Sequence, residues 1–147
     1  MHDVTLDPAA AVTRTSLRVR FCDTDLMGIV HHANYLAYFE VGRVEYLRRR
    51  GVTYAQWASR GVHLPVVEAA VRYRGAARFD DVLEVEVRLV QLRSYSLRFD
   101  YVLTREGTQL AEGTTRLACV DATHALLRIP EDILRVLTRG ESATTEM

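Results

Sequence analysis

The stretch richest in ionisable side chains covers residues 21–35 and reads FCDTDLMGIVHHANY. It places two aspartates one residue apart, then a glycine and two adjacent histidines, directly before a segment with helical periodicity. A carboxylate can deprotonate water or attack a carbonyl carbon. The unpaired NH groups of a helix start can polarise that carbonyl or hold an oxyanion. The combination of Asp25 with a helix start near His32 therefore indicates an acyl-transfer site.

Other uses of these side chains remain open. An aspartate at a strand end commonly caps a turn, and Asp25 and His32 can equally form a buried structural hydrogen bond. Four side chains of the stretch are competent metal ligands, but adjacent side chains diverge and the chain has no second His or Cys cluster, so we expect no metal. No phosphate-cradling glycine loop is present. The G-x-S-x-G motif is also absent, which disfavours serine hydrolase chemistry.

The elements that position this stretch follow from the apolar periodicity. Residues 16–21 alternate as a strand does, and apolar residues then recur at helical spacing over residues 34–50. Asn34 can cap the start of this helix and Gly51 can take the left-handed closing position. The result is one helix of about seventeen residues, or roughly 25 Å, with an apolar face broad enough to be mostly buried.

Strand periodicity dominates the rest of the chain, after a short helical turn at residues 54–60. We expect one strand or two short ones in residues 62–73, further strands at 80–89, 97–103 and 110–120, and a closing helix at 130–137. This order predicts an α+β fold in which a curved antiparallel sheet wraps around one long central helix. The outer face and the edges of such a sheet favour assembly into an oligomer.

Composition and charge narrow the class of protein. The chain has 147 residues, 48% of them hydrophobic, which fits one soluble domain. Lys plus Arg and Asp plus Glu both count 19, so no broad field favours nucleic acid or an anionic membrane surface. Two cysteines and the lack of a signal-peptide core favour the cytoplasm and no membrane span. We expect a loose leader over 1–13, a domain over 14–138 and a flexible tail over 139–147.

The pattern D-T-D-x-x-G-x-V-x-H-x-x-Y at residues 23–35 resembles the signature of the 4-hydroxybenzoyl-CoA thioesterase-like acyl-CoA thioesterases of the hotdog fold. It is most similar to the branch that includes the bacterial thioesterase linked to the Tol-Pal system. The likeness covers roughly residues 14–135, including AYFEVGRVEYLRRRG and the segments 73–81 and 92–97. It implies a thioester hydrolase without a cofactor, which binds acyl-CoA between the subunits of a homodimer or homotetramer.

The resemblance also assigns roles to residues. It implies that Asp25 is the catalytic carboxylate, as general base or as nucleophile, and that the backbone NH of His32 polarises the thioester carbonyl, with its side chain also implicated. Two positions depart from the Tol-Pal-linked branch: Phe21 replaces a tyrosine, and Ala76 replaces a proline. The expected substrate-binding residues are Gly28, Ile29, Val30, Asn34, Tyr35, Arg93 and Ser94.

Two other functions remain open. A hotdog-fold dehydratase acting on acyl thioesters is the nearest enzyme alternative, but its H-F-P-x-x-P-x-x-P-G segment is absent from this chain. A non-catalytic acyl-CoA-binding module is the alternative from a different class. Both CoA and acyl carrier protein remain open as the carrier of the acyl group.

Overall fold

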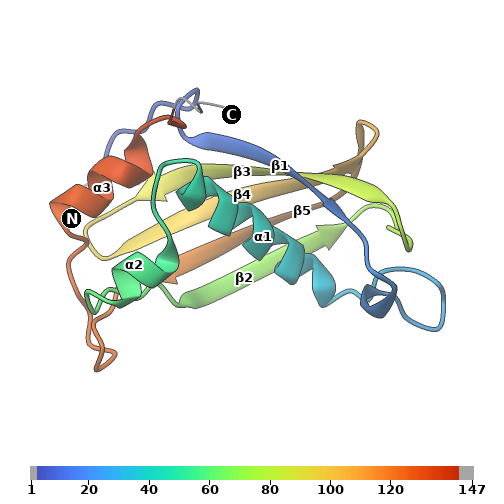
Figure 1. The fold of residues 1–147 in the computed structure, drawn as a ribbon, viewed down its shortest axis with the longest axis horizontal. Helices are drawn as coiled ribbons and strands as arrows, with labels where there is room; N and C mark the ends of the chain where they lie inside the picture. The colour runs from blue at the N-terminus through green and yellow to red at the C-terminus, as the bar shows by residue number, and fades with distance from the viewer. Residues whose placement is uncertain (1–2, 143–147) are drawn as a thin grey trace.

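The structure is a computed structural model of the chain, described over residues 3–142, in which one antiparallel sheet curves around a central helix (Figure 1). The strands follow the spatial order β1-β3-β4-β5-β2, and every neighbouring pair is antiparallel. The strands are β1 (Val12–Arg18), β2 (Val66–Tyr73), β3 (Val82–Leu92), β4 (Ser96–Arg105) and β5 (Thr108–Ala118). The helices are η1 (Phe21–Asp23), α1 (Asn34–Arg48), α2 (Tyr54–Ala58) and α3 (Glu131–Thr138). The predicted α+β architecture is confirmed.

Helix α1 packs its aromatic face against the concave side of the sheet. Phe39 stacks on Tyr101 of β4 with ring centroids 4.6 Å apart, and Tyr46 meets Phe99 edge to face at 5.2 Å. The inward-facing residues of β3 and β4 are fully buried, as their alternation predicts. Outside this buried face, α1 carries two partly exposed apolar side chains, Leu36 and Val41.

The ends of α1 differ in part from the prediction. Ala33, and not Asn34, occupies the cap position, and no side chain caps the helix there. The Asn34 amide instead donates to the carbonyl oxygen of Asp23 at 2.8 Å. Gly51 adopts the predicted left-handed conformation, with φ +86°.

The first strand begins earlier than the sequence periodicity indicated. Val12 and Thr13 already pair with β3, and Ala11 is buried. The Val4 NH donates to the Leu92 carbonyl at 2.7 Å. The predicted leader therefore ends too late in the sequence, because residues 12 and 13 already belong to β1 through non-local pairing with β3. Residues 1–2 of the predicted leader lie outside the described residues.

The C-terminal end is also held where a flexible tail was predicted from residue 139. The Ser142 NH donates to the Arg49 carbonyl at 2.7 Å, and Glu141 accepts a hydrogen bond from Thr13. Residues 143–147 of the predicted tail lie outside the described residues.

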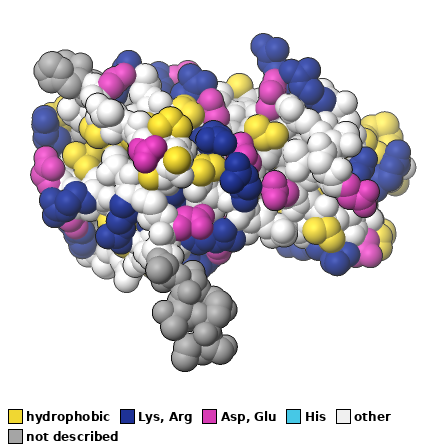
Figure 2. Space-filling view, turned by 90° about the horizontal axis from the view of Figure 1, so that it is seen from above, with side chains coloured by type: hydrophobic (Ala, Val, Ile, Leu, Met, Phe, Trp, Pro, Cys, Tyr) yellow, Lys and Arg dark blue, Asp and Glu magenta, His cyan; other side chains and the backbone are white. Residues whose placement is uncertain are grey.

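Charged side chains of both signs mix on the surface. Figure 2 shows basic and acidic side chains side by side over one face of the molecule, as the balanced composition indicates. Across residues 3–142, no helix is long and apolar enough to cross a bilayer.

Candidate active site

The predicted catalytic stretch forms a narrow hairpin between η1 and α1, at the opposite end of the sheet from α2 and α3 (Figure 1). Thr24 pairs with Val30, and the Asp25 NH donates to the Ile29 carbonyl at 2.9 Å. The chain reverses at Gly28, whose NH donates to the Asp25 carbonyl and whose φ of +77° favours glycine. A second segment supports the hairpin, because Ile29 pairs with Arg78.

Asp25 is half-buried and lies directly before the reversing turn of this hairpin. Its Oδ1 accepts a hydrogen bond from the Met27 NH at 2.9 Å, which orients the carboxylate. This is the turn-capping use that the sequence left open. Among residues 3–142 no donor is paired with Asp25 Oδ2, so one carboxylate oxygen remains available to a water molecule or a substrate.

His32 lies one residue before the cap of α1, so its NH precedes the helix rather than belonging to its first turn. No acceptor for this NH occurs within the described part of the chain, whereas its carbonyl accepts from the Tyr73 hydroxyl at 2.8 Å. The exposed rings of His31 and His32 stack with centroids 4.2 Å apart. His31 Nδ1 accepts a hydrogen bond from the Ala33 NH at 3.2 Å, so the His31 ring stabilises the backbone just before α1.

Asp23 has a structural environment unlike that of Asp25. It is 2% exposed, and its carboxylate accepts hydrogen bonds from the Arg20 backbone NH, the Arg20 guanidinium and the Tyr38 hydroxyl. Burial by itself would raise the pKa of Asp23, but these three hydrogen bonds outweigh it and hold the pKa below its usual value. Burial and the nearby Asp23 carboxylate also raise the pKa of the Tyr38 hydroxyl.

The predicted substrate-binding residues near the hairpin fall into two groups. Gly28 is exposed and Ile29 is half-buried, so both border the surface of the hairpin. Val30 and Tyr35 are buried in the core, and the Tyr35 hydroxyl accepts from the Ala77 NH at 3.3 Å. The Asn34 amide is turned toward Asp23, as described above. Substrate contact by these residues remains a prediction.

Arg93 and Ser94 lie at the other end of the sheet, in the turn between β3 and β4. Strand β3 has 11 residues and therefore separates this turn from the hairpin end by about 33 Å. Arg93 pairs with Asp3 at 2.7 Å, and the Ser94 carbonyl accepts from the Ile129 NH. One copy of the chain does not bring these two residues to Asp25.

Three features beside the hairpin were not predictable from the sequence. Phe21 and Phe79 form an exposed edge-to-face pair with centroids 5.7 Å apart. The Tyr73 hydroxyl donates a hydrogen bond to the His32 carbonyl, and the Tyr38 hydroxyl donates one to the Asp23 carboxylate. The helical spacing of Tyr38 predicted its burial, but not the hydrogen bond, because the partner lies on a separate segment.

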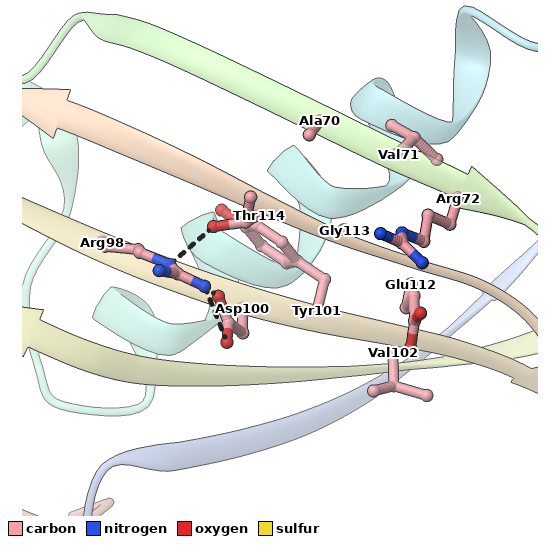
Figure 3. Close-up of a pocket in the computed structure, with 10 residues that line it drawn as sticks. All are labelled: Ala70, Val71, Arg72, Arg98, Asp100, Tyr101, Val102, Glu112, Gly113 and Thr114. Carbon is pink, nitrogen blue, oxygen red and sulfur yellow. Dashed lines mark hydrogen bonds and ion pairs between the residues drawn. The ribbon is translucent and has the colours of Figure 1, made fainter.

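The convex face of the sheet carries a separate groove of about 420 Å³ (Figure 3). Its polar lining comes from β2, β4 and β5, and α1 lies behind the sheet in this view. Arg98 contacts Asp100 and Thr114 there, so its charge is compensated within the groove. The groove is thus not part of the hairpin site. Across the described residues no group of three or more metal-ligating side chains is gathered.

Comparisons with known proteins agree with this architecture. The sequence profile of the thioesterase-like superfamily matches residues 19–137. The acyl-CoA thioester hydrolase YbgC of Escherichia coli is 35% identical over 109 residues, which are 74% of this chain and 81% of that protein. The crystal structure of the hypothetical protein TT1821 from Thermus thermophilus is 46% identical, with a TM-score of 0.82, covering 86% of this chain and 95% of that one.

A more distant structure shows the fold alone. A 4-hydroxybenzoyl CoA thioesterase complexed with 4-hydroxybenzoyl CoA is 19% identical, with a TM-score of 0.79, covering 87% of this chain and 99% of that one. The predicted hotdog fold is confirmed by these structural neighbours. With more than half of its length matched, this chain belongs to the thioesterase-like superfamily.

Proposed function

We propose that this protein hydrolyses the thioester bond of an acyl-CoA, releasing the free acid and CoA. The observation that carries the proposal is that the same short segment holds two groups with no hydrogen-bond partner among the described residues. One is a carboxylate oxygen of Asp25, and the other is the backbone NH of His32. The names of relatives such as the E. coli acyl-CoA thioester hydrolase support the same reaction.

In this mechanism the His32 NH hydrogen-bonds the thioester carbonyl oxygen and stabilises the negative charge that develops there. Asp25 acts in one of two ways. As a general base it takes a proton from water, the hydroxide adds to the carbonyl carbon, and the C–S bond breaks to release the CoA thiolate. As a nucleophile its oxygen adds to the same carbon and expels the thiolate, and water then hydrolyses the mixed anhydride. The thiolate takes up a proton in either case.

Replacing Asp25 by Asn tests the assignment, with CoA release from an acyl-CoA panel as the readout. We expect Asp25→Asn to fold normally and to lose activity by about 100-fold or more. His32→Ala should be intermediate, because it keeps the backbone NH. Asp80→Asn is the matched control, since Asp80 is an exposed aspartate paired with Arg18.

Three outcomes would contradict the proposal. Near-wild-type turnover by Asp25→Asn would exclude the assigned carboxylate. Tight acyl-CoA binding by the wild-type protein without CoA release would identify a binding module instead. Loss of water from a hydroxyacyl thioester, with the thioester bond intact, would identify a dehydratase. Including acyl carrier protein thioesters in the panel determines which carrier is used.

A second copy of the chain is part of the proposal. Strand β2 is an edge of the sheet, and apolar residues along it, Val66, Val67 and Tyr73, are about half exposed. Edge strands of this kind pair readily with another chain. The Tyr73 end of β2 contacts His32. Antiparallel pairing of β2 with β2 of a second copy therefore moves the distant turn of that copy toward the hairpin.

This homodimer would supply Arg93 and Ser94 from the second copy to the site of the first. The exposed residues Leu36 and Val41 of α1 offer a further apolar surface through which two dimers would form a homotetramer. We place this assembly in the cytoplasm, because Cys22 and Cys119 are both free thiols.

A further inference from the structure

The carboxylate of Asp23 joins three segments of the chain at the hairpin. Its Oδ2 accepts from the Arg20 NH at 2.9 Å and from the Tyr38 hydroxyl of α1 at 2.8 Å. Its Oδ1 accepts from the Arg20 guanidinium at 3.0 Å. The strand end, η1 and the buried face of α1 are thus fixed to one buried group.

The backbone carbonyl of the same residue fixes the approach to the helix. It accepts from the His31 NH at 2.9 Å and from the Asn34 side-chain amide at 2.8 Å. His32 lies between these two anchored residues. The direction of the His32 NH therefore depends on where Asp23 is held. Two residues of the long helix hold it: the Tyr38 hydroxyl binds the Asp23 carboxylate, and the Asn34 amide binds the Asp23 carbonyl.

We propose that Asp23 is a positioning residue for thioester hydrolysis, held by Tyr38, and that it acts by fixing the backbone that carries the His32 NH. The inference rests on the function proposed above and adds a residue to it. Asp23 itself is buried and does not touch the substrate. Only the ionised carboxylate is purely an acceptor and so matches all three donors, because protonation converts one acceptor site to a donor.

The need for an ionised Asp23 carboxylate predicts how activity depends on pH. Activity is expected to fall as Asp23 becomes protonated at acid pH. Loss of the Tyr38 hydroxyl removes one of the hydrogen bonds that favour the ionised form, so the acid limb of the pH profile would move to higher pH. The titratable groups that face the Asp23 carboxylate are Arg20, Cys22 and Tyr38, with Tyr35 beside Tyr38.

The chain offers a matched pair of variants on one helix. Tyr38→Phe removes the hydroxyl that holds Asp23, whereas Tyr46→Phe removes a buried hydroxyl at the other end of α1, which donates to the Leu137 carbonyl at 2.7 Å. Each change deletes one oxygen and one hydrogen bond from the core. We expect similar losses of thermal stability. Only Tyr38→Phe should lower kcat, by about tenfold, with little change in KM and with a shifted acid limb.

A readout independent of turnover accompanies the kinetics. The amide NMR signal of His32 should shift in Tyr38→Phe and stay in place in Tyr46→Phe. An unchanged His32 signal together with wild-type kcat in Tyr38→Phe would overturn the inference, and so would an equal loss of kcat in Tyr46→Phe. These results differ from a failure of the proposed function, in which Asp25→Asn would keep its activity or the wild type would release no CoA.

Discussion

Gly42 of α1 lies directly against Val87 of β3: a Cβ at position 42 would overlap the Val87 Cγ2 and stand 2.7 Å from the Val85 Cγ1. The helix approaches the sheet this closely only because residue 42 has no side chain. Gly42→Ala should therefore destabilise the protein by about 1–3 kcal/mol, despite the higher helix propensity of alanine. Thermal or urea unfolding measures the loss.

Two further variants make this test specific. Gly140→Ala is the control, since the nearest atom to a Cβ at position 140 is 3.8 Å away, and it should change stability by less than about 0.5 kcal/mol. Adding Val87→Ala to Gly42→Ala should cost less than the sum of the single changes, because it removes one of the two crowding methyl groups. Additive losses would argue against a direct clash.

Arg50 is a fully buried cation at the end of α1. Its guanidinium lies 3.5 Å above the Tyr46 ring and donates to the Thr13 hydroxyl and to four backbone carbonyls, those of Ala10, Val12, Tyr46 and Arg139. Arg50→Met would leave these acceptors without a donor and should cost about 3 kcal/mol or more.

Denaturant unfolding of Arg50→Met checks this value, with Arg48→Met as the control. Arg48 is mostly exposed and pairs with Glu45 on the helix surface, so its loss should cost less than about 1 kcal/mol. An equally small loss for Arg50→Met would show that water replaces the guanidinium at little cost.

The environment of Asp81 predicts that the free energy of unfolding decreases at acid pH. Burial alone would raise the pKa of Asp81, but its Oδ2 accepts from the Arg78 NH at 2.9 Å and from Arg105 at 2.8 Å, and the net result is a lowered pKa. A carboxyl whose pKa is lowered by folding stabilises the protein above its unfolded-state pKa, near 3.8, and this contribution is lost as pH falls through the lower folded-state value.

Asp81→Asn should therefore lower stability at neutral pH and flatten the fall in stability below about pH 4. Unfolding curves measured from pH 7 to pH 3 give both slopes. Asp80→Asn serves as the control, because Asp80 is exposed and its contact with Arg18 is a surface ion pair. A slope for Asp81→Asn as steep as that of the wild type would assign the acid sensitivity to other groups.

The exposed edge strand β2 allows the proposed oligomer to be tested. Val67 is 54% exposed on this edge strand, so Val67→Lys should disrupt the proposed pairing and lower the molar mass measured by light scattering. Val90→Lys is the control, because Val90 is 41% exposed on β3 in the interior of the sheet. Unaltered assembly in Val67→Lys, or equal loss in Val90→Lys, would place the interface elsewhere.

The long helix was predictable because its evidence is local. The recurrence of Tyr35, Phe39, Gly42 and Tyr46 at helical spacing defines one face, and the structure buries each of these residues. The start of β1 at Val12 was not predictable in this way, since it depends on pairing with β3, more than seventy residues away.

The sequence also did not predict which charged side chains are buried. Arg43 resembles an ordinary surface residue of a helix, yet it is 7% exposed and donates to the hydroxyls of Tyr54 and Tyr101. Likewise, the spacing of Asp23 and Asp25 does not show which aspartate is buried. That difference arises from Tyr38 and Arg20, which reach Asp23 only after the chain folds.

The position of Arg93 and Ser94 at the far end of the sheet has a consequence for the proposed enzyme. A site that draws on both ends of the sheet exists only while two chains are associated. Dilution below the dissociation constant of the pair would then switch off turnover, although each separated chain keeps its hydrophobic core. Specific activity would depend on enzyme concentration, and two inactive chains, one lacking Asp25 and the other Arg93, would regain activity when mixed.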